Sequence, residues 1–243
     1  MLNKETKEFK METKNVKNAF NDVRSDSDVR IRILAARNCE NPDEFINDPN
    51  SRVRLEVVKR GCKLESFIGD KSSIVREAVA NQGFGLDKLV NDPDWSVRRA
   101  VAMQSYGLDK LIEDSSFGVR MAVAKMGYKL DVLVRDTNEF VRVEVARQGY
   151  DLNRLRNDYS PLVRAEIARS GNFLNQYVKD QDVGVRLEVV RRGYALDIMS
   201  GDKSPRIRAE VAKRGFNIDQ LIKDEDFTVR FAAARYLDMV NVE

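Results

Sequence analysis

The sequence has few of the residue types on which most catalytic and metal sites depend. It contains no histidine, which is the commonest general base and metal ligand near neutral pH. Its two cysteines, Cys39 and Cys62, are too few for a disulfide framework and lack the spacing of a metal site. We therefore expect two free thiols, no bound metal, no cofactor and no enzymatic activity.

Long apolar runs and a surplus of one charge are missing as well. No stretch approaches the roughly 18 uncharged apolar residues of a membrane-spanning helix, and the N-terminus has no apolar core of the kind that a secretory signal needs. We expect a cytoplasmic protein that does not enter membranes. The 42 Lys and Arg residues nearly balance the 39 Asp and Glu residues, and a net charge of +3 is not the strongly basic signature of a nucleic-acid-binding domain.

What the sequence does contain is one pattern repeated ten times without an insertion or a gap. An arginine recurs every 22 residues, and an aspartate stands six residues before each arginine. In such an array each repeat contacts its neighbours, so chain length does not predict the number of globular domains. The arginines are Arg32, Arg54, Arg76, Arg98, Arg120, Arg142, Arg164, Arg186, Arg208 and Arg230, and they number the repeats from 1 to 10.

Each repeat predicts one α-helix around its arginine. The preceding residue is Val or Ile in all ten repeats, and small apolar residues follow three and four positions after the arginine. At 100° per residue these positions share one helix face. Pro93, Pro161 and Pro205 lie where the first turn is expected. A left-handed glycine seven positions after the arginine is expected to end the helix in seven repeats, at Gly61, Gly83, Gly127, Gly149, Gly171, Gly193 and Gly215.

The remainder of each repeat is too short for a second full helix. Apolar residues at spacings of three and four, such as Leu86, Leu89 and Val90, fit one turn of α-helix or 3-10 helix. We therefore predict an all-α solenoid of ten 22-residue repeats, each with one α-helix and a short α or 3-10 segment, over residues 23–243. Residues 1–22 are predicted to form a charged capping helix. The last helix, with Leu237 and Met239, either closes the array as a cap or joins two molecules end to end.

The repeat resembles the leucine-rich repeat variant branch of the HEAT-like repeat superfamily. The likeness extends over residues 23 to about 237, and in one repeat the matching residues are Leu130, Leu133, Asp136, Val141, Arg142, Val145 and Ala146. The resemblance implies a right-handed superhelix with α-helices in one layer and short 3-10-like segments in the other. It also implies that the aspartates and arginines form a polar ladder through the stack. Some members carry an iron–sulfur module, but this chain lacks the cysteine cluster that would hold one.

Ten copies of an Asp and Arg pair favour a structural role, because a catalytic site needs one asymmetric constellation. Each aspartate could cap its own helix or accept hydrogen bonds from an arginine of the same or an adjoining repeat. A semi-buried arginine needs such a partner. In the middle of the chain the predicted ladder consists of Asp92, Arg98, Asp114, Arg120, Asp136, Arg142, Asp158 and Arg164.

The side chains that vary between repeats are the candidates for binding. Five positions after the arginine most repeats carry Lys or Arg, and two positions after it several carry Glu. We expect the cations and the glutamates on the outward helix face, at a spacing that allows ion pairs between them. These rows either neutralise each other or present the cations to the phosphates of a nucleic acid. The cations of this basic row that we consider candidates are Lys125, Arg147, Arg169, Arg191 and Lys213.

Repeats 3 to 5 interrupt both rows. Ala78, Ala100 and Ala122 replace the glutamates close to the only tryptophan of the chain. Trp, Met and Arg are enriched in interface cores, so this less charged window is a candidate contact surface. Alternatively, its aromatic residues pack between repeats and the alanines are neutral drift. The candidate residues, called the Trp95 patch below, are Trp95, Arg99, Met103, Phe117 and Met121.

Together these patterns favour a non-catalytic repeat scaffold that binds a protein or peptide partner on its helical face. The alternative is a protein that binds the phosphate backbone of a nucleic acid along the basic row.

Overall fold

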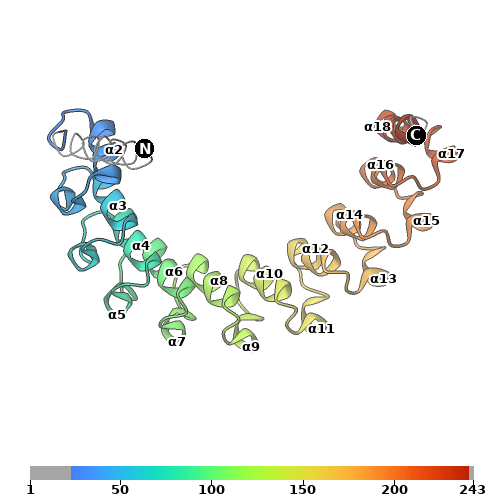
Figure 1. Ribbon diagram of the computed structural model, residues 1–243. Helices are drawn as coiled ribbons and strands as arrows, with labels where there is room; N and C mark the ends of the chain where they lie inside the picture. The colour runs from blue at the N-terminus through green and yellow to red at the C-terminus, as the bar shows by residue number, and fades with distance from the viewer. Residues whose placement is uncertain (1–22, 241–243) are drawn as a thin grey trace, which may run out of the picture. The chain divides into compact units, whose positions relative to one another are not determined.

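In the computed structural model, which describes residues 23–240, the fold over that range is all-α. The chain divides into two compact units, Met1–Tyr128 and Lys129–Glu243, which we call the N-terminal and the C-terminal unit. In both units long helices alternate with four-residue helices along the chain (Figure 1). The predicted all-α repeat fold is thereby confirmed. The predicted capping helix over residues 1–22 lies outside the described residues.

The helices follow the 22-residue period in both units. In the N-terminal unit they are α2 (Val29–Asn38), η1 (Pro42–Phe45), α3 (Ser51–Lys59), η2 (Leu64–Phe67), α4 (Ser73–Asn81), α5 (Leu86–Leu89), α6 (Trp95–Met103), α7 (Leu108–Leu111) and α8 (Phe117–Lys125). In the C-terminal unit they are α9 (Leu130–Leu133), α10 (Glu139–Arg147), α11 (Leu152–Leu155), α12 (Pro161–Arg169), α13 (Leu174–Tyr177), α14 (Val183–Arg191), α15 (Leu196–Met199), α16 (Pro205–Lys213), α17 (Ile218–Leu221) and α18 (Phe227–Val240). The short segments η1 and η2 are 3-10 helices, and the later ones are α-helical.

The long helices begin after a polar residue that stands four positions before the arginine. In α6 this N-cap is Asp94, whose side chain accepts the N–H of Ser96 at 2.8 Å. Pro161 and Pro205 are the first residues of α12 and α16, as predicted. The prediction for Pro93 was wrong, because this residue precedes the N-cap.

The glycine seven positions after the arginine ends the helix in a left-handed conformation, as predicted, with φ between +72° and +89°. In repeat 4 Ser105 takes the same conformation at φ +57°. Repeat 10 has Leu237 at this position instead, and α18 continues to Val240. The helix continues because neither a left-handed residue nor an extended one, such as Cys39 after α2, interrupts it at this position.

A second left-handed residue, two positions after the first, precedes each short helix from η2 to α17 and was not predicted. Gly85 and Gly107 occupy this position with φ of +64° and +63°. A Cβ on Gly107 would lie 2.6 Å from Cγ2 of Val90, so this turn also packs closely against the preceding repeat. In the other repeats a residue with a side chain adopts the conformation, at Lys63, Lys129, Asp151, Phe173, Ala195 and Asn217.

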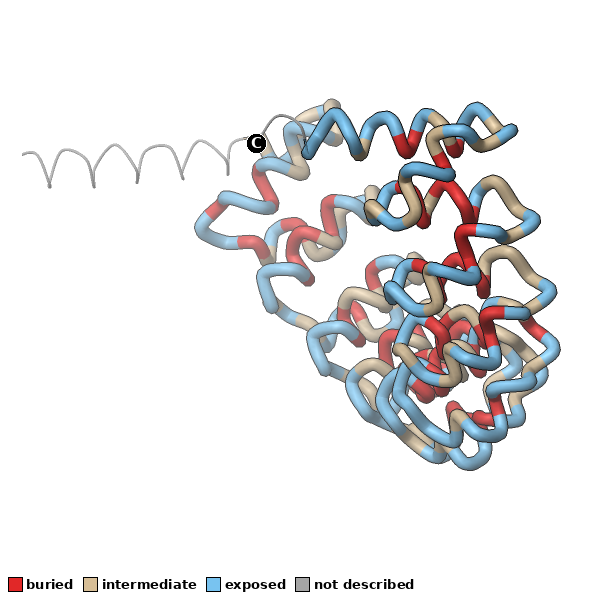
Figure 2. The backbone as a smooth tube through the Cα atoms, turned by 90° about the vertical axis from the view of Figure 1, so that its right-hand side faces the viewer, coloured by how far each residue is buried: buried red, intermediate tan, exposed pale blue. Residues whose placement is uncertain are grey.

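The core of each unit lies between the helices of successive repeats. The Val before the arginine is fully buried, as at Val97 and Val141, and so are leucines of the short helices such as Leu111 and Leu133. Successive long helices contact one another, for example α6 with α8 and α12 with α14. In Figure 2 the buried residues recur as short stretches along the helices, as expected when each helix buries one face.

Candidate interaction surface and the ion-pair ladders that position it

The repeating arginines connect each repeat to the next. Arg54 donates from Nε and Nη2 to the two carboxylate oxygens of Asp70 in the following repeat, both at 2.7 Å. Its Nη1 donates to the backbone carbonyl of Asp48 in its own repeat, also at 2.7 Å. Asp70 Oδ1 additionally accepts the N–H of Ser72 at 2.8 Å. One arginine therefore fixes the loop before its own helix and the loop before the next.

The same bonds recur in both units. Of the other predicted ladder residues, Arg120 donates from Nη1 to the carbonyl of Asp114 at 2.7 Å, and Asp136 accepts the N–H of Asn138 at 2.8 Å. Asp70 and the aspartates of the pairs named next bond to an arginine of the preceding repeat, and the helix N-caps are other residues, such as Asn50 and Asp94. The further pairs between consecutive repeats are Arg32–Asp48, Arg76–Asp92, Arg98–Asp114, Arg142–Asp158, Arg164–Asp180, Arg186–Asp202 and Arg208–Asp224.

These ion pairs are withdrawn from water. The side chains of Arg54 and Asp70 are only 5% and 7% exposed. Burial by itself raises the pKa of Asp70, but the hydrogen bonds from Arg54 and from the Ser72 N–H outweigh burial, so the pKa lies below its usual value. For Asp224 the hydrogen bond from Arg208 is the largest cause of a lowered pKa. A row of identical, fully bonded pairs has the character of a framework and not of a catalytic site.

A second row of ion pairs crosses the long helices. Arg147 donates to Glu144 of its own helix at 2.6 Å and to Glu166 of the next helix at 3.2 Å. Arg169 repeats this arrangement with Glu166 at 2.7 Å and Glu188 at 3.2 Å. Glu166 is therefore held between cations of two successive repeats. Related pairs are Arg37–Glu56, Lys59–Glu56, Arg191–Glu188 and Lys213–Glu210.

The glutamates of this row do not lie on the outward face, and our expectation for them was wrong. Glu144 and Glu188 are only 5% and 6% exposed, whereas the side chains of Arg147 and Arg169 are half exposed. In the C-terminal unit Glu166 and Glu188 face the preceding helix and accept hydrogen bonds from its arginine. A helical wheel of a single repeat cannot show this burial, because the neighbouring helix creates it.

The Trp95 patch is formed by two adjacent helices of the N-terminal unit. Since α6 and α8 pack against each other, residues from two repeats share one surface. Trp95 and Phe117 are 46% and 45% exposed. The side chains stand on successive helical turns in two rows of three, namely Trp95, Arg99 and Met103 on α6 and Phe117, Met121 and Lys125 on α8. The remaining candidates, Arg147, Arg169, Arg191 and Lys213, lie on separate helices of the C-terminal unit.

Around the Trp95 patch the cation and its carboxylate partner are replaced together. Ala100 and Ala122 are buried where the second row has a glutamate. Asn81 and Met103 stand in the preceding repeats where that row has a cation. The ion pair that joins α4 to α6 lies instead at other positions of these helices, between Glu77 and Arg99.

Trp95 is held from two sides although nearly half of its surface is exposed. Its ring lies so close to α8 that a Cβ on Gly118 would be 3.0 Å from Cζ3 of the indole. The Arg99 guanidinium lies 5.2 Å from the ring centroid. Arg99 is itself bound to Glu77 of α4 at 3.1 Å. Packing between repeats and exposure to solvent are thus combined in one side chain.

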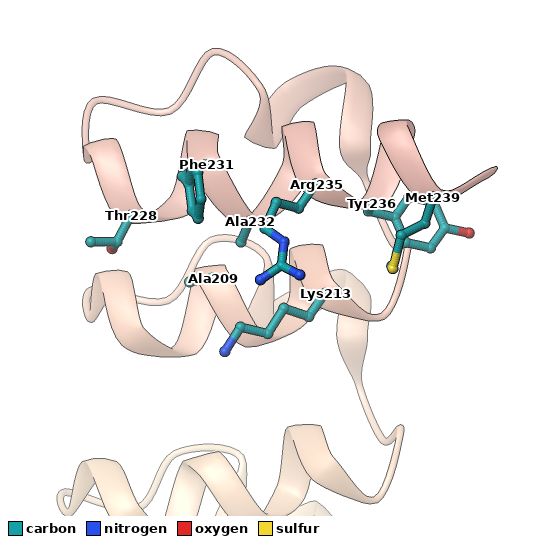
Figure 3. Close-up of a pocket in the computed structure, with 8 residues that line it drawn as sticks. All are labelled: Ala209, Lys213, Thr228, Phe231, Ala232, Arg235, Tyr236 and Met239. Carbon is teal, nitrogen blue, oxygen red and sulfur yellow. The ribbon is translucent and has the colours of Figure 1, made fainter. Parts of the chain in front are cut away.

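The sequence did not predict a pocket between α16 and α18. Its volume is about 410 Å³, and its lining includes Lys213, Phe231, Ala232, Arg235 and Met239 (Figure 3). Only Lys213 was among the predicted candidates. The signal that could have found the pocket is Ala232, which stands where repeats 6 to 9 carry a glutamate.

Within residues 23–240 no group of three or more His, Cys, Asp or Glu residues could hold a metal ion. No helix in that range is both long and apolar enough to cross a membrane. Cys39 and Cys62 are free thiols. The chain matches no protein-family model and no curated protein. The resemblance to the leucine-rich repeat variant branch therefore stays a prediction.

Proposed function

We propose that the protein is a non-catalytic repeat scaffold that binds a protein or peptide partner on its long helices, with the Trp95 patch as the central contact. The observation that carries the proposal is a half-exposed tryptophan whose position is already fixed by Gly118 and Arg99. An ordered aromatic side chain buries a large area on binding and loses little conformational entropy.

The composition of the patch supports the same function. Phe117, Met103 and Met121 accompany Trp95, and the flanking ion-pair row is interrupted at this place. Interface centres are enriched in aromatic residues, Met and Arg and depleted of other charges. Because the surrounding polar residues of the second row are already paired, they suit a rim around such a centre.

The ion pairs of the second row weaken the alternative of nucleic-acid binding. A phosphate would compete with glutamate oxygens that already lie 2.6–3.2 Å from the Arg147 guanidinium. If phosphate contacts nevertheless dominated, the affinity for an oligonucleotide would fall steeply with salt, by roughly one power of the salt concentration for each contact. An affinity that hardly changes with salt would exclude this alternative.

The first experiment compares partners captured from native lysate by wild type, by Trp95→Ala/Met103→Glu and by Ile198→Ala. Ile198 is an exposed residue of the short helix α15 and serves as the matched control. We expect a partner that wild type and Ile198→Ala retain and that the double variant loses. Identical sets of captured proteins would refute the proposed contact.

The second experiment titrates the purified partner against the protein and follows tryptophan emission. Since Trp95 is the only tryptophan, a shift to shorter wavelength in the presence of a tryptophan-free partner fragment reports burial of this side chain. In isothermal titration calorimetry, which needs no tryptophan signal, Trp95→Ala should weaken binding about 30-fold, which corresponds to a hot-spot loss of about 2 kcal/mol. Unchanged emission at saturation would show that binding occurs elsewhere.

A further inference from the structure

The pocket between α16 and α18 occurs where the second row of ion pairs lacks a carboxylate. Repeats 2 and 6 to 9 carry a glutamate two positions after the arginine, and Glu166 accepts from Arg147 and Arg169 of two successive repeats. Glu56 likewise accepts from Arg37 at 3.0 Å and from Lys59 at 2.9 Å. The repeat therefore contains its own template for binding a carboxylate between two cations.

Repeat 10 has the two cations without the carboxylate. Lys213 and Arg235 occupy the cation positions of repeats 9 and 10, and Ala232 occupies the position of the glutamate. At no other junction in the sequence do cations of two consecutive repeats flank an alanine. Lys213 pairs with Glu210 of its own helix at 3.4 Å. No ion pair joins Arg235 to a carboxylate among residues 23–240.

The surroundings of the two cations are apolar. Figure 3 shows Arg235 reaching from α18 toward α16, with its guanidinium beside the Lys213 side chain. Phe231 and Met239 project from α18 on either side of Arg235, and both are more than half exposed. The volume of about 410 Å³ lies within the usual range of small-ligand sites. Two neighbouring cations and an apolar wall are complementary to an anion that carries an apolar group.

We propose that this pocket binds a carboxylate with an apolar substituent. The carboxylate accepts hydrogen bonds from Lys213 and Arg235 in the place that Glu56 and Glu166 take in their own repeats. The substituent covers Phe231 and Met239. Such a ligand is either an aliphatic carboxylic acid or an acidic side chain next to an apolar residue in a peptide, and both offer the same chemistry to the pocket.

The test uses the full chain and four probes. Octanoate represents the free acid, and an acetylated, amidated Leu-Glu-Leu peptide represents the acidic side chain. Acetate lacks the apolar group, and 1-octanol lacks the charge. The carbon-13 methyl signal of Met239, assigned with Met239→Leu, reports binding at this pocket. We expect saturable shifts with octanoate, with the peptide or with both, and at least tenfold weaker binding of acetate and octanol.

Three variants separate this pocket from non-specific binding. Arg235→Gln removes one cation, and Ala232→Glu supplies the missing carboxylate from the chain itself. Each should weaken binding of the responding probe at least tenfold. Arg191→Gln is the matched control, because the Arg191 junctions already contain Glu188 and Glu210, and it should leave the affinity unchanged.

Each outcome decides the proposal or the source of the ligand. A response to octanoate alone assigns the site to free acids, and a response to the peptide alone assigns it to acidic side chains. Absence of saturation by both probes up to their solubility limits would overturn the proposal. Affinity that survives in Ala232→Glu, in a variant whose circular dichroism matches wild type, would overturn it as well.

Discussion

Removal of one ladder carboxylate should destabilise the N-terminal unit far more than removal of a surface carboxylate. Asp70→Ala deletes both hydrogen bonds from Arg54 and the acceptor of the Ser72 N–H. Arg54 remains buried, at 4% exposure, without its counter-charge. Breaking a buried ion pair costs about 3–5 kcal/mol, because the remaining charge is uncompensated. Arg54 keeps its bond to the carbonyl of Asp48, so we expect a loss near the lower end of that range.

The measurement is urea unfolding followed by Trp95 fluorescence, which reports on the same unit. Glu65→Ala in the exposed part of η2 is the control and should change the free energy of unfolding by less than about 0.5 kcal/mol. A double-mutant cycle with Arg54→Met isolates the pair, and a coupling energy of about 1–3 kcal/mol is expected for directly bonded residues. If Asp70→Ala were no more harmful than Glu65→Ala, the ladder would not stabilise the stack.

Three further predictions concern the same framework. The lowered pKa values of Asp114 and Asp224 contribute stability that is present above the unfolded-state pKa of about 3.9. This stability is lost as pH falls through the folded-state pKa values. The urea concentration at the midpoint of unfolding should therefore decrease when the pH is lowered below about 4, and a midpoint that does not change with pH would contradict the lowered pKa values. Ala100→Glu places a carboxylate at a buried position where Asn81 and Met103 replace the two cations of the row, and urea unfolding should show a loss of about 3 kcal/mol or more. A neutral effect would show that the new carboxylate reaches water or another cation. Gly107→Ala should destabilise the protein by about 1–2 kcal/mol, whereas Ala195→Gly at the equivalent left-handed position should stabilise it by about 0.5–1 kcal/mol. Thermal melts that rank the two variants in the opposite order would show that the left-handed backbone is not strained by a side chain at this position.

The features that depend on one repeat alone could be predicted from the sequence. The spacing of Val97 and Val101 gives a helix face, and a glycine such as Gly83 ends the helix, because both rules act within a few residues. The burial of Glu188 could not be predicted in this way, since it lies between α12 and α14 and accepts from Arg169 of the preceding helix. The left-handed conformation of Phe173 is likewise set by the turn that packs repeats together, against the preference of the residue.

For the candidate surface, too, the sequence could predict only what depends on one repeat. The sequence indicated Trp95 as a candidate because it is the only tryptophan of the chain and stands where the rows of glutamates and of cations are interrupted. Its packing on Gly118 and its contact with Arg99 required the neighbouring helix and the rotamers. The pocket at Ala232 was missed because a missing carboxylate becomes significant only when its two cations are known to be adjacent.

The ladder bonds have a direction along the chain. At each junction described within the two units, the donor belongs to the earlier repeat and the acceptor to the later one, as in Arg142 and Asp158. Within each unit the repeats therefore join in the same orientation. Within a unit, a block of 22 residues or a multiple of 22 can be duplicated or deleted while each described junction keeps the same bonds, whereas a change of another length would set an arginine against the wrong residue. The framework thus allows a unit to lengthen or shorten only by whole repeats, and the area of its helical surface changes in equal steps.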